Sequence, residues 1–200
     1  IKRYLEEYVE FGGFPETVNY ESILKIRTLR EYLDLIIYKD LVERYSIKKI
    51  GVMKSLIGIA VKNFASRTSV KRLHNTLLSS GNKLSKSKIY EYFSYLEDIG
   101  FIISIKKFSY SEMESAGSIP KIYLADNGFP TVYGLRDAGR RMENIVAVEL
   151  MRRKYYFNPV LEIKYYLGRN KKDVDFVVSE GMRVKKLIQV CYDPSDPYTR

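Results

Sequence analysis

Basic and hydroxyl side chains gather around residues 71–90, where two helices are predicted. Such side chains at the start of a helix suit contact with phosphate, because the helix N-terminus also offers unpaired N–H groups. The alternatives are a solvated basic face, or a helix pair that packs against another protein. The candidate DNA-binding residues are Lys71, Arg72, Lys83, Lys86, Ser87, Lys88 and Tyr90.

Four side chains nearer the C-terminus form a second candidate site. Glu143 lies on the apolar face of a predicted helix, and Asp175 lies on one face of a predicted strand. Gln189 and Cys191 share one face of the strand that follows. These side chains could therefore line one site, with Glu143 above it. In the structural alternative, Asp175 caps a turn or pairs with a nearby basic residue: Arg169, Lys171 or Lys172.

Three other residues are expected to have structural roles. Glu149 falls about 240° around the predicted helix from Glu143. It lies beside Arg152 and Arg153, which predicts a surface ion pair. His74 has no partner at metal-ligand spacing, and Cys191 on an apolar strand is typical of a small buried hydrophobic residue.

The elements that position these residues follow from apolar periodicity and from Gly, Pro and Ser breaks. Helices are predicted over residues 1–10, 21–45, 52–65, 70–79, from 85 or 87 to 99, and over 139–157; strands are predicted over 101–105, 121–125, 161–167, 173–178 and 187–192. The order helix, tight turn, helix and two-stranded ribbon, found before residue 126, is that of a winged helix. The loop over residues 109–120 contains Glu112 and Glu114 but no Lys or Arg, so the helix rather than the wing is the expected DNA reader. The final helix and three strands predict a second domain, and the expected fold class is α/β of the α+β kind.

The net charge of +10 over 200 residues is concentrated in one segment. Residues 51–110 carry ten basic and three acidic side chains, a net of +7, and residues 142–200 carry eleven against eight, a net of +3. This pattern indicates that a module, rather than the whole surface, meets an anionic partner such as DNA.

The composition also excludes several classes of protein. One Cys and one His exclude a disulfide framework and a Cys/His zinc cluster. No apolar run reaches the length of a membrane helix and no signal peptide opens the chain, so a cytoplasmic protein without a membrane partner is expected. Ile1 in place of an initiator Met predicts a piece of a longer protein.

Seven separated motifs together resemble the C-terminal part of archaeal AAA-type ATPases: GGFPE, LREYLDLIIYKDLVERY, YEYFSYLEDIGFI, KIYLADNGF, GRRMENIVAVELMRRK, DVDFVV and LIQVCYD. In that family an ATPase domain is followed by a winged helix and a PD-(D/E)XK nuclease-like domain. The resemblance implies that residues 1–50 are the end of the ATPase module with connecting helices, 51–130 a winged helix, and 131–200 a nuclease-like domain whose fold would normally continue past Arg200. It also implies an ATPase domain as partner, with ATP bound there, because no G-x-x-x-x-G-K-[ST] run occurs here.

The resemblance also assigns roles in the second candidate site. In active members two carboxylates hold Mg²⁺ and a lysine helps to activate the attacking water. By position, Glu143 resembles the helix acid and Asp175 the strand acid. Where the fold has an acid, any residue and Lys, this chain has Gln189-Val190-Cys191, so the catalytic set is expected to be degenerate. Lys164 is the candidate for a migrated lysine.

The sequence therefore predicts a DNA-binding fragment of an archaeal AAA-type ATPase with an inactive nuclease-like domain and no cofactor of its own. Two alternatives stay open. One is an active Mg²⁺-dependent endonuclease, and the other is a protein–protein interaction module of the ATPase. Association with further copies of the chain is also left open.

Overall fold

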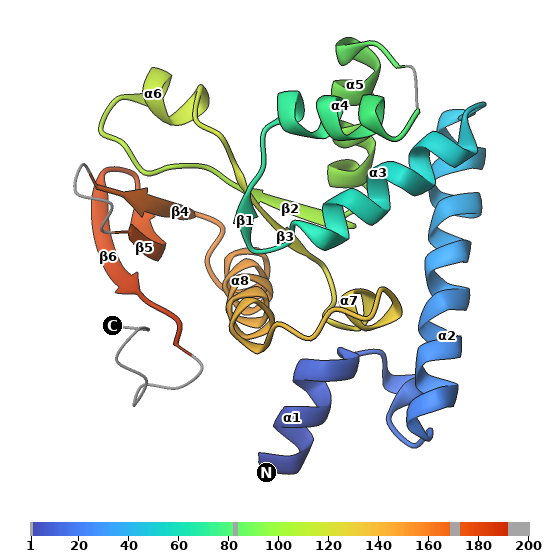
Figure 1. Cartoon of the computed structure of the whole chain (residues 1–200). Coiled ribbons are helices and arrows are strands. Elements are labelled where there is room, and N and C mark those ends of the chain that lie inside the picture. Colours follow the sequence, from blue (N-terminus) through green and yellow to red (C-terminus); the bar gives the residue numbers. More distant parts are fainter. Residues whose placement is uncertain (1, 82–83, 169–172, 192–200) are drawn as a thin grey trace.

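The computed structural model describes residues 2–81, 84–168 and 173–191 and is a mixed α+β structure, which confirms the predicted fold class. The first third is helical (Figure 1). Its elements are α1 (Lys2–Phe11), a short 3-10 turn η1 (Pro15–Thr17), α2 (Ser22–Leu35), its π-helical continuation η2 (Ile36–Glu43), and α3 (Ile50–Lys62). The long helix predicted over residues 21–45 is thus one rod with a change of helical pitch.

The middle third contains a three-stranded antiparallel sheet with strand order β1-β3-β2. Its elements are β1 (Ser66–Arg67), α4 (Val70–Ser79), α5 (Lys86–Asp98), β2 (Ile102–Ile105), α6 (Glu112–Ala116) and β3 (Lys121–Leu124). With α3 in front, this is the order of elements in which a winged helix is built. The two-residue strand β1 and the helix α6 are absent from the sequence-based expectation, because both are too short to leave a periodic signal.

Local capping explains where the two central helices begin. Ser69 accepts a hydrogen bond from the N–H of Arg72 at the start of α4, and Ser85 accepts one from the N–H of Lys88 at the start of α5. Of the two predicted starts of α5, Ser85 is therefore the cap. Gly81 and Gly100 follow the two helices with φ of 81° and 71°, a conformation that favours glycine.

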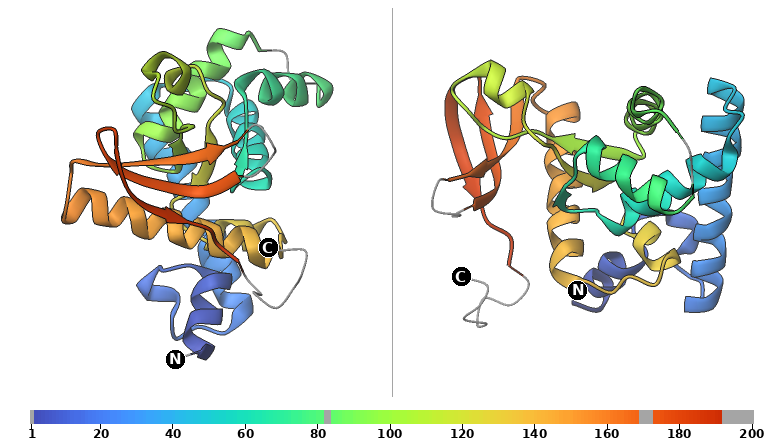
Figure 2. Two further views of the ribbon diagram at one scale, coloured as in Figure 1. Left: turned by 90° about the vertical axis from the view of Figure 1, so that its left-hand side faces the viewer. Right: turned by 45° about the horizontal axis from the view of Figure 1, so that its top comes forward.

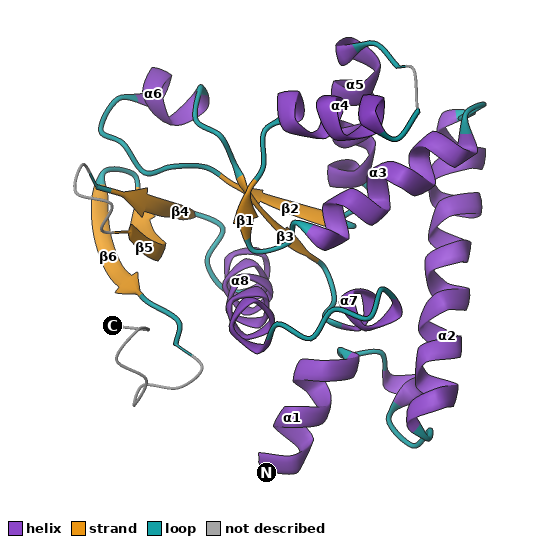
Figure 3. Cartoon of the chain, viewed as in Figure 1, coloured by secondary structure: helices purple, strands orange, loops and turns teal. Residues whose placement is uncertain are grey.

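The last third consists of two helices and a second antiparallel sheet, with strand order β4-β5-β6. Its elements are α7 (Gly128–Val132), α8 (Ala138–Tyr156), β4 (Leu161–Leu167), β5 (Asp173–Glu180) and β6 (Arg183–Ile188). The strands are confined to the two small sheets (Figure 3), and α8 runs along one face of the second sheet (Figure 2). The strand predicted over residues 187–192 is displaced: β6 starts earlier and ends at Ile188.

One hydrophobic core joins these parts, with buried residues from α3, α4, α5, α8 and both sheets. Asn144 of α8 is fully buried and exchanges two hydrogen bonds with the backbone of Leu124, so its amide extends the ladder of β3. The loop after β2 meets β4, where the N–H of Phe108 donates to the carbonyl of Tyr165 at 2.6 Å. The second sheet is therefore fastened to the first.

Candidate functional site

The two predicted carboxylates meet around a lysine that the sequence does not single out. Lys121 extends from β3, and its Nζ lies 2.6 Å from Oε1 of Glu143 on α8 and 2.9 Å from Oδ1 of Asp175 on β5. The three side chains are 13%, 13% and 9% exposed. We call Lys121, Glu143 and Asp175 the acidic site. It is built from three elements that are far apart in the sequence.

Further donors complete the shell of both carboxylates. The hydroxyl of Tyr123 donates to Oε1 of Glu143 at 2.6 Å, and the backbone N–H of Val190 donates to Oδ2 of Asp175 at 3.0 Å. Each acid is thus satisfied by groups of the protein itself. The structure selects Lys121 as the partner of Asp175, whereas Arg169, Lys171 and Lys172 lie outside the described residues.

Gln189 does not contribute to the acidic site in the expected way. It follows the end of β6, is exposed, and its Oε1 accepts the backbone N–H of Asp175 at 3.3 Å. The predicted role failed because β6 ends before the residue, so the alternation of a strand no longer orients its side chain. Lys164 is also directed elsewhere, since it pairs with Glu162 at 2.7 Å. Cys191 is half-buried.

Burial dominates the electrostatics of the acidic site. It works against the charge of Lys121, but Glu143 and Asp175 outweigh it and raise the pKa of the ammonium. Burial raises the pKa of Glu143, and Lys121 offsets part of that effect. Burial and the neighbouring Glu143 hold the pKa of Tyr123 far above its ordinary value. Tyr123 is therefore a fixed hydrogen-bond donor at neutral pH.

The acidic site as arranged does not fit Mg²⁺. That ion takes six oxygen ligands in near-ideal octahedral geometry and enters protein sites through carboxylates. Here the space between the two carboxylates belongs to the ammonium of Lys121, and the described residues contain no group of three or more His, Cys, Asp or Glu that could hold a metal ion.

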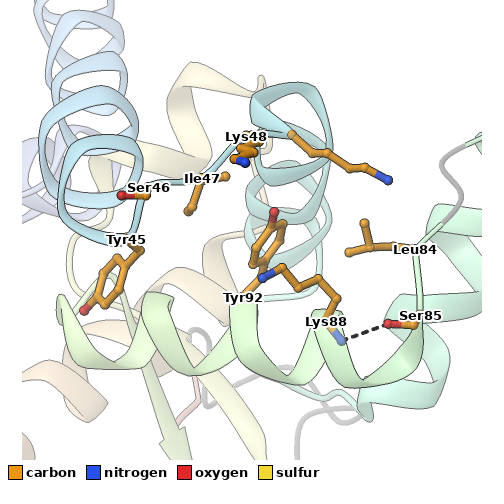
Figure 4. A pocket seen from close by; sticks show the side chains of 9 residues that line it. Tyr45, Ser46, Ile47, Lys48, Leu84, Ser85, Lys88 and Tyr92 are labelled. Atoms are coloured by element: carbon orange, nitrogen blue, oxygen red, sulfur yellow. Dashed lines mark hydrogen bonds between the residues drawn. The ribbon is translucent and has the colours of Figure 1, made fainter.

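A basic pocket of about 470 Å³ opens beside the N-terminus of α5 (Figure 4). Lys48 and Lys49 approach it from the turn after η2, and Lys88 approaches it from α5. The remaining walls are Tyr45, Ser46, Ile47, Leu84, Ser85 and Tyr92. We call Lys48, Lys49, Ser85, Lys86 and Lys88 the basic end of α5.

Sequence reasoning missed Lys48 and Lys49. Both fall within residues 1–50, where acidic and basic side chains cancel. A usable signal existed in their position, because the pair directly precedes the helix that opens the +7 segment. Their approach to α5 is a tertiary contact.

The predicted DNA-binding residues fall into two groups. Lys86, Ser87 and Tyr90 are exposed on α5. Lys71 and Arg72 are exposed at the opposite end of α4 from the turn that leads into α5, about 12 Å along the helix axis. Lys83 lies outside the described residues.

One flank of α5 is already occupied. Lys88 pairs with Glu91 at 2.6 Å, and Tyr95 donates to the same carboxylate. Tyr95 also stacks on Tyr45 with ring centroids 3.9 Å apart, while Asp98 pairs with Arg44 at 3.1 Å. The C-terminal half of α5 therefore packs on the end of η2, and the side of α5 that remains open for phosphate is its N-terminal end.

The wing does not present a basic surface. Lys107 pairs with Glu114 of α6 at 2.7 Å, and the loop packs on β4 through Phe108 and Tyr165. The hydroxyl of Tyr165 donates to the carbonyl of Ile119, which ties the other end of the loop to the same strand. The wing is thus a joint between the two sheets.

Two minor expectations agree with the contacts. Glu149 is held by Arg152 at 2.6 Å and Arg153 at 2.7 Å, and hydrogen bonds from these two residues lower its pKa to about 2. Nε2 of His74 lies 3.0 Å from the carbonyl of Leu84, so this ring supports the turn before α5.

Comparison with known proteins places most of the chain in one family. Residues 2–136 match the model of a domain of unknown function, DUF8612. An uncharacterized protein of Methanocaldococcus jannaschii is 38% identical over 196 residues, which cover 96% of this chain and 43% of that protein. An uncharacterized protein of Haemophilus influenzae is 26% identical over 197 residues, which cover 96% of this chain and 47% of that protein. The chain thus spans less than half the length of these relatives.

No solved structure matches the chain. Within residues 2–81, 84–168 and 173–191, every helix is too short or too polar to cross a membrane.

Proposed function

The chain belongs to the DUF8612 family, and we propose that it binds the phosphate backbone of DNA through the basic end of α5. The observation that carries the proposal is the pocket into which Lys48 and Lys49 project from one element and Lys88 from another. Exposed Lys86 and Ser87 extend the same surface. Lysines from two elements beside a helix N-terminus present several charges to one stretch of backbone, while a point-like ammonium reads no base.

The binding is proposed to be independent of sequence. Base reading requires several side chains of α5 to enter a groove, but its C-terminal half carries Glu91, Glu97 and Asp98 and packs partly on η2. These carboxylates would face phosphates if the whole helix were inserted. Contact by the N-terminal end alone avoids that repulsion.

Binding without cleavage is the second part of the proposal. Both carboxylates of the acidic site are engaged by Lys121, and the arrangement does not fit Mg²⁺. In the cytoplasm, the resemblance to archaeal AAA-type ATPases assigns the use of the bound DNA to an ATPase domain elsewhere in a longer protein.

The test is a salt titration of DNA binding, followed by fluorescence anisotropy with two labelled duplexes of unrelated sequence. Lys48→Ala, Lys49→Ala and Lys86→Ala should each weaken binding to both duplexes equally. Each should also lower the slope of log K against log salt by about one unit, because one phosphate contact is lost. Lys39→Ala, which removes an exposed lysine from η2, is the matched control and should bind like the wild type. Equal affinity and slope in all four variants would refute the proposal.

A protein-interaction module is the second candidate, and two packed surfaces favour it. The flank of α5 lies on η2 and the wing lies on β4, which are surfaces that many winged helices offer to DNA. In that case wild-type binding to both duplexes would be weak at physiological salt, and the lysine substitutions would change nothing.

A further inference from the structure

We propose that the ammonium of Lys121 is the resident cation of the acidic site, where it holds Glu143 and Asp175 together and keeps a divalent cation out. The inference is independent of DNA binding. It rests on the position of one atom, because Nζ of Lys121 lies within 3 Å of an oxygen of each acid.

Burial makes this position selective. All three side chains are at most 13% exposed, so a carboxylate left there without a partner would lose most of its hydration. One cation shared by two acids is the arrangement that a divalent ion commonly provides. Here the chain supplies it from β3, and the raised pKa of the ammonium keeps it charged at neutral pH.

The remaining contacts leave little for an incoming metal. Tyr123 donates to the same Glu143 oxygen that Lys121 contacts, and the N–H of Val190 donates to the second oxygen of Asp175. A divalent ion would have to break these contacts and would also meet an ammonium of like charge a few ångströms away. Metal entry therefore requires that Lys121 leave.

The same contacts connect two parts of the chain. Lys121 lies within residues 2–136, which match the DUF8612 family, whereas Glu143 and Asp175 lie beyond them. Lys121 therefore clamps β3 of the first sheet to α8 and to β5 of the second sheet. The clamp stands beside the wing contact between Phe108 and Tyr165, so the two sheets are joined at two places.

The experiment compares the full chain with Lys121→Met, a neutral side chain of similar length, and with Lys62→Met, an exposed control. Mn²⁺ binding is followed by electron paramagnetic resonance, and Tm is measured with and without Mn²⁺. The wild type and K62M should bind no Mn²⁺ at millimolar concentration. K121M should lose about 10 °C in Tm and then bind Mn²⁺, with recovery of part of the loss. The triple variant K121M/E143Q/D175N should bind none.

Three outcomes would overturn the inference: Mn²⁺ binding by the wild type, an unchanged Tm in K121M, or a folded K121M that ignores Mn²⁺. Metal-dependent DNA cleavage by the wild type that is lost in K121M would also overturn it, and would make Lys121 a catalytic lysine. If K121M does not fold, NMR of the side-chain ammonium groups in the ¹⁵N-lysine-labelled wild type decides. The Lys121 signal should stay sharp during Mn²⁺ addition, and its selective broadening would contradict the proposal.

Discussion

Asp126 occupies a buried position in which it serves two backbone donors. Its carboxylate accepts the N–H of Gly13 at 2.7 Å and the N–H of Gly128 at 2.6 Å. Gly12 adopts φ of 80°, and a Cβ there would fall 1.7 Å from Oδ1 of Asp126. The paired glycines of the GGFPE motif are therefore required by one side chain from a distant part of the chain.

Burial raises the pKa of Asp126, and the two backbone hydrogen bonds offset part of that effect. In the folded state the carboxyl therefore keeps its proton to a higher pH than in the unfolded chain. Between the ordinary pKa of 3.8 and the raised value, the folded state binds more protons, so stability falls as pH rises through this window.

We expect this pH dependence to disappear in Asp126→Asn. Urea unfolding at a series of pH values should show that the wild type loses stability relative to D126N as pH rises from about 4, until the folded carboxyl is ionised. Above that pH the difference should be constant. Asp40→Asn, at an exposed position of η2, is the control and should follow the wild type. A parallel profile for the wild type and D126N would show that burial does not shift this group.

At the scale of elements, α5 is a helix whose two ends serve different purposes. Its N-terminal end is capped by Ser85 and faces the basic pocket, and its C-terminal half packs on η2 through Tyr95 and Asp98. The same element therefore combines an exposed basic surface with a packing contact. The position of the basic end depends on the cap, because the first turn of a helix is its least stable part.

Ser85→Ala removes the side-chain acceptor of the Lys88 N–H and should cost about 1 kcal/mol in the free energy of unfolding. Chemical denaturation measures this loss. Ser94→Ala, on the exposed face of the same helix, is the matched control and should change the free energy of unfolding by less than about 0.5 kcal/mol. Equal effects of the two substitutions would show that the cap makes no special contribution.

At the scale of the whole molecule, one arginine joins the N-terminal helix to the rest. Arg141 of α8 is 4% exposed, and its guanidinium donates to four backbone carbonyls and one hydroxyl. The acceptors are the carbonyls of Val9, Glu10, Asn127 and Leu135 and the hydroxyl of Thr131. The C-terminal end of α1 is thus fixed against α7 and α8.

Arg141→Lys should destabilise the chain by about 3 kcal/mol, because a lysine ammonium cannot reproduce the planar fork and leaves buried carbonyls without donors. Denaturant unfolding gives the loss, and limited proteolysis should cut first within residues 9–14. Arg136→Lys, at an exposed position, should leave stability and cleavage unchanged. Wild-type stability in R141K would show that the charge alone is sufficient.

The sequence by itself determined most elements and some local contacts. Apolar spacing predicted α2, α3, α4, α5 and α8, and hydroxyl side chains marked the caps Ser69 and Ser85. Helical spacing also predicted the ion pair of Glu149 with Arg152 and Arg153. These features depend on residues within a few positions of one another, which is the range over which a sequence pattern reports geometry.

Tertiary structure alone decided which charges meet. Lys121 is 22 residues from Glu143 and 54 from Asp175, and the basic pocket joins residues 48–49 to residues 85–88. No local pattern distinguishes Lys121 from the other lysines. Its place follows from how β3 packs between α8 and β5, and burial there makes a shared ammonium more favourable than two isolated carboxylates.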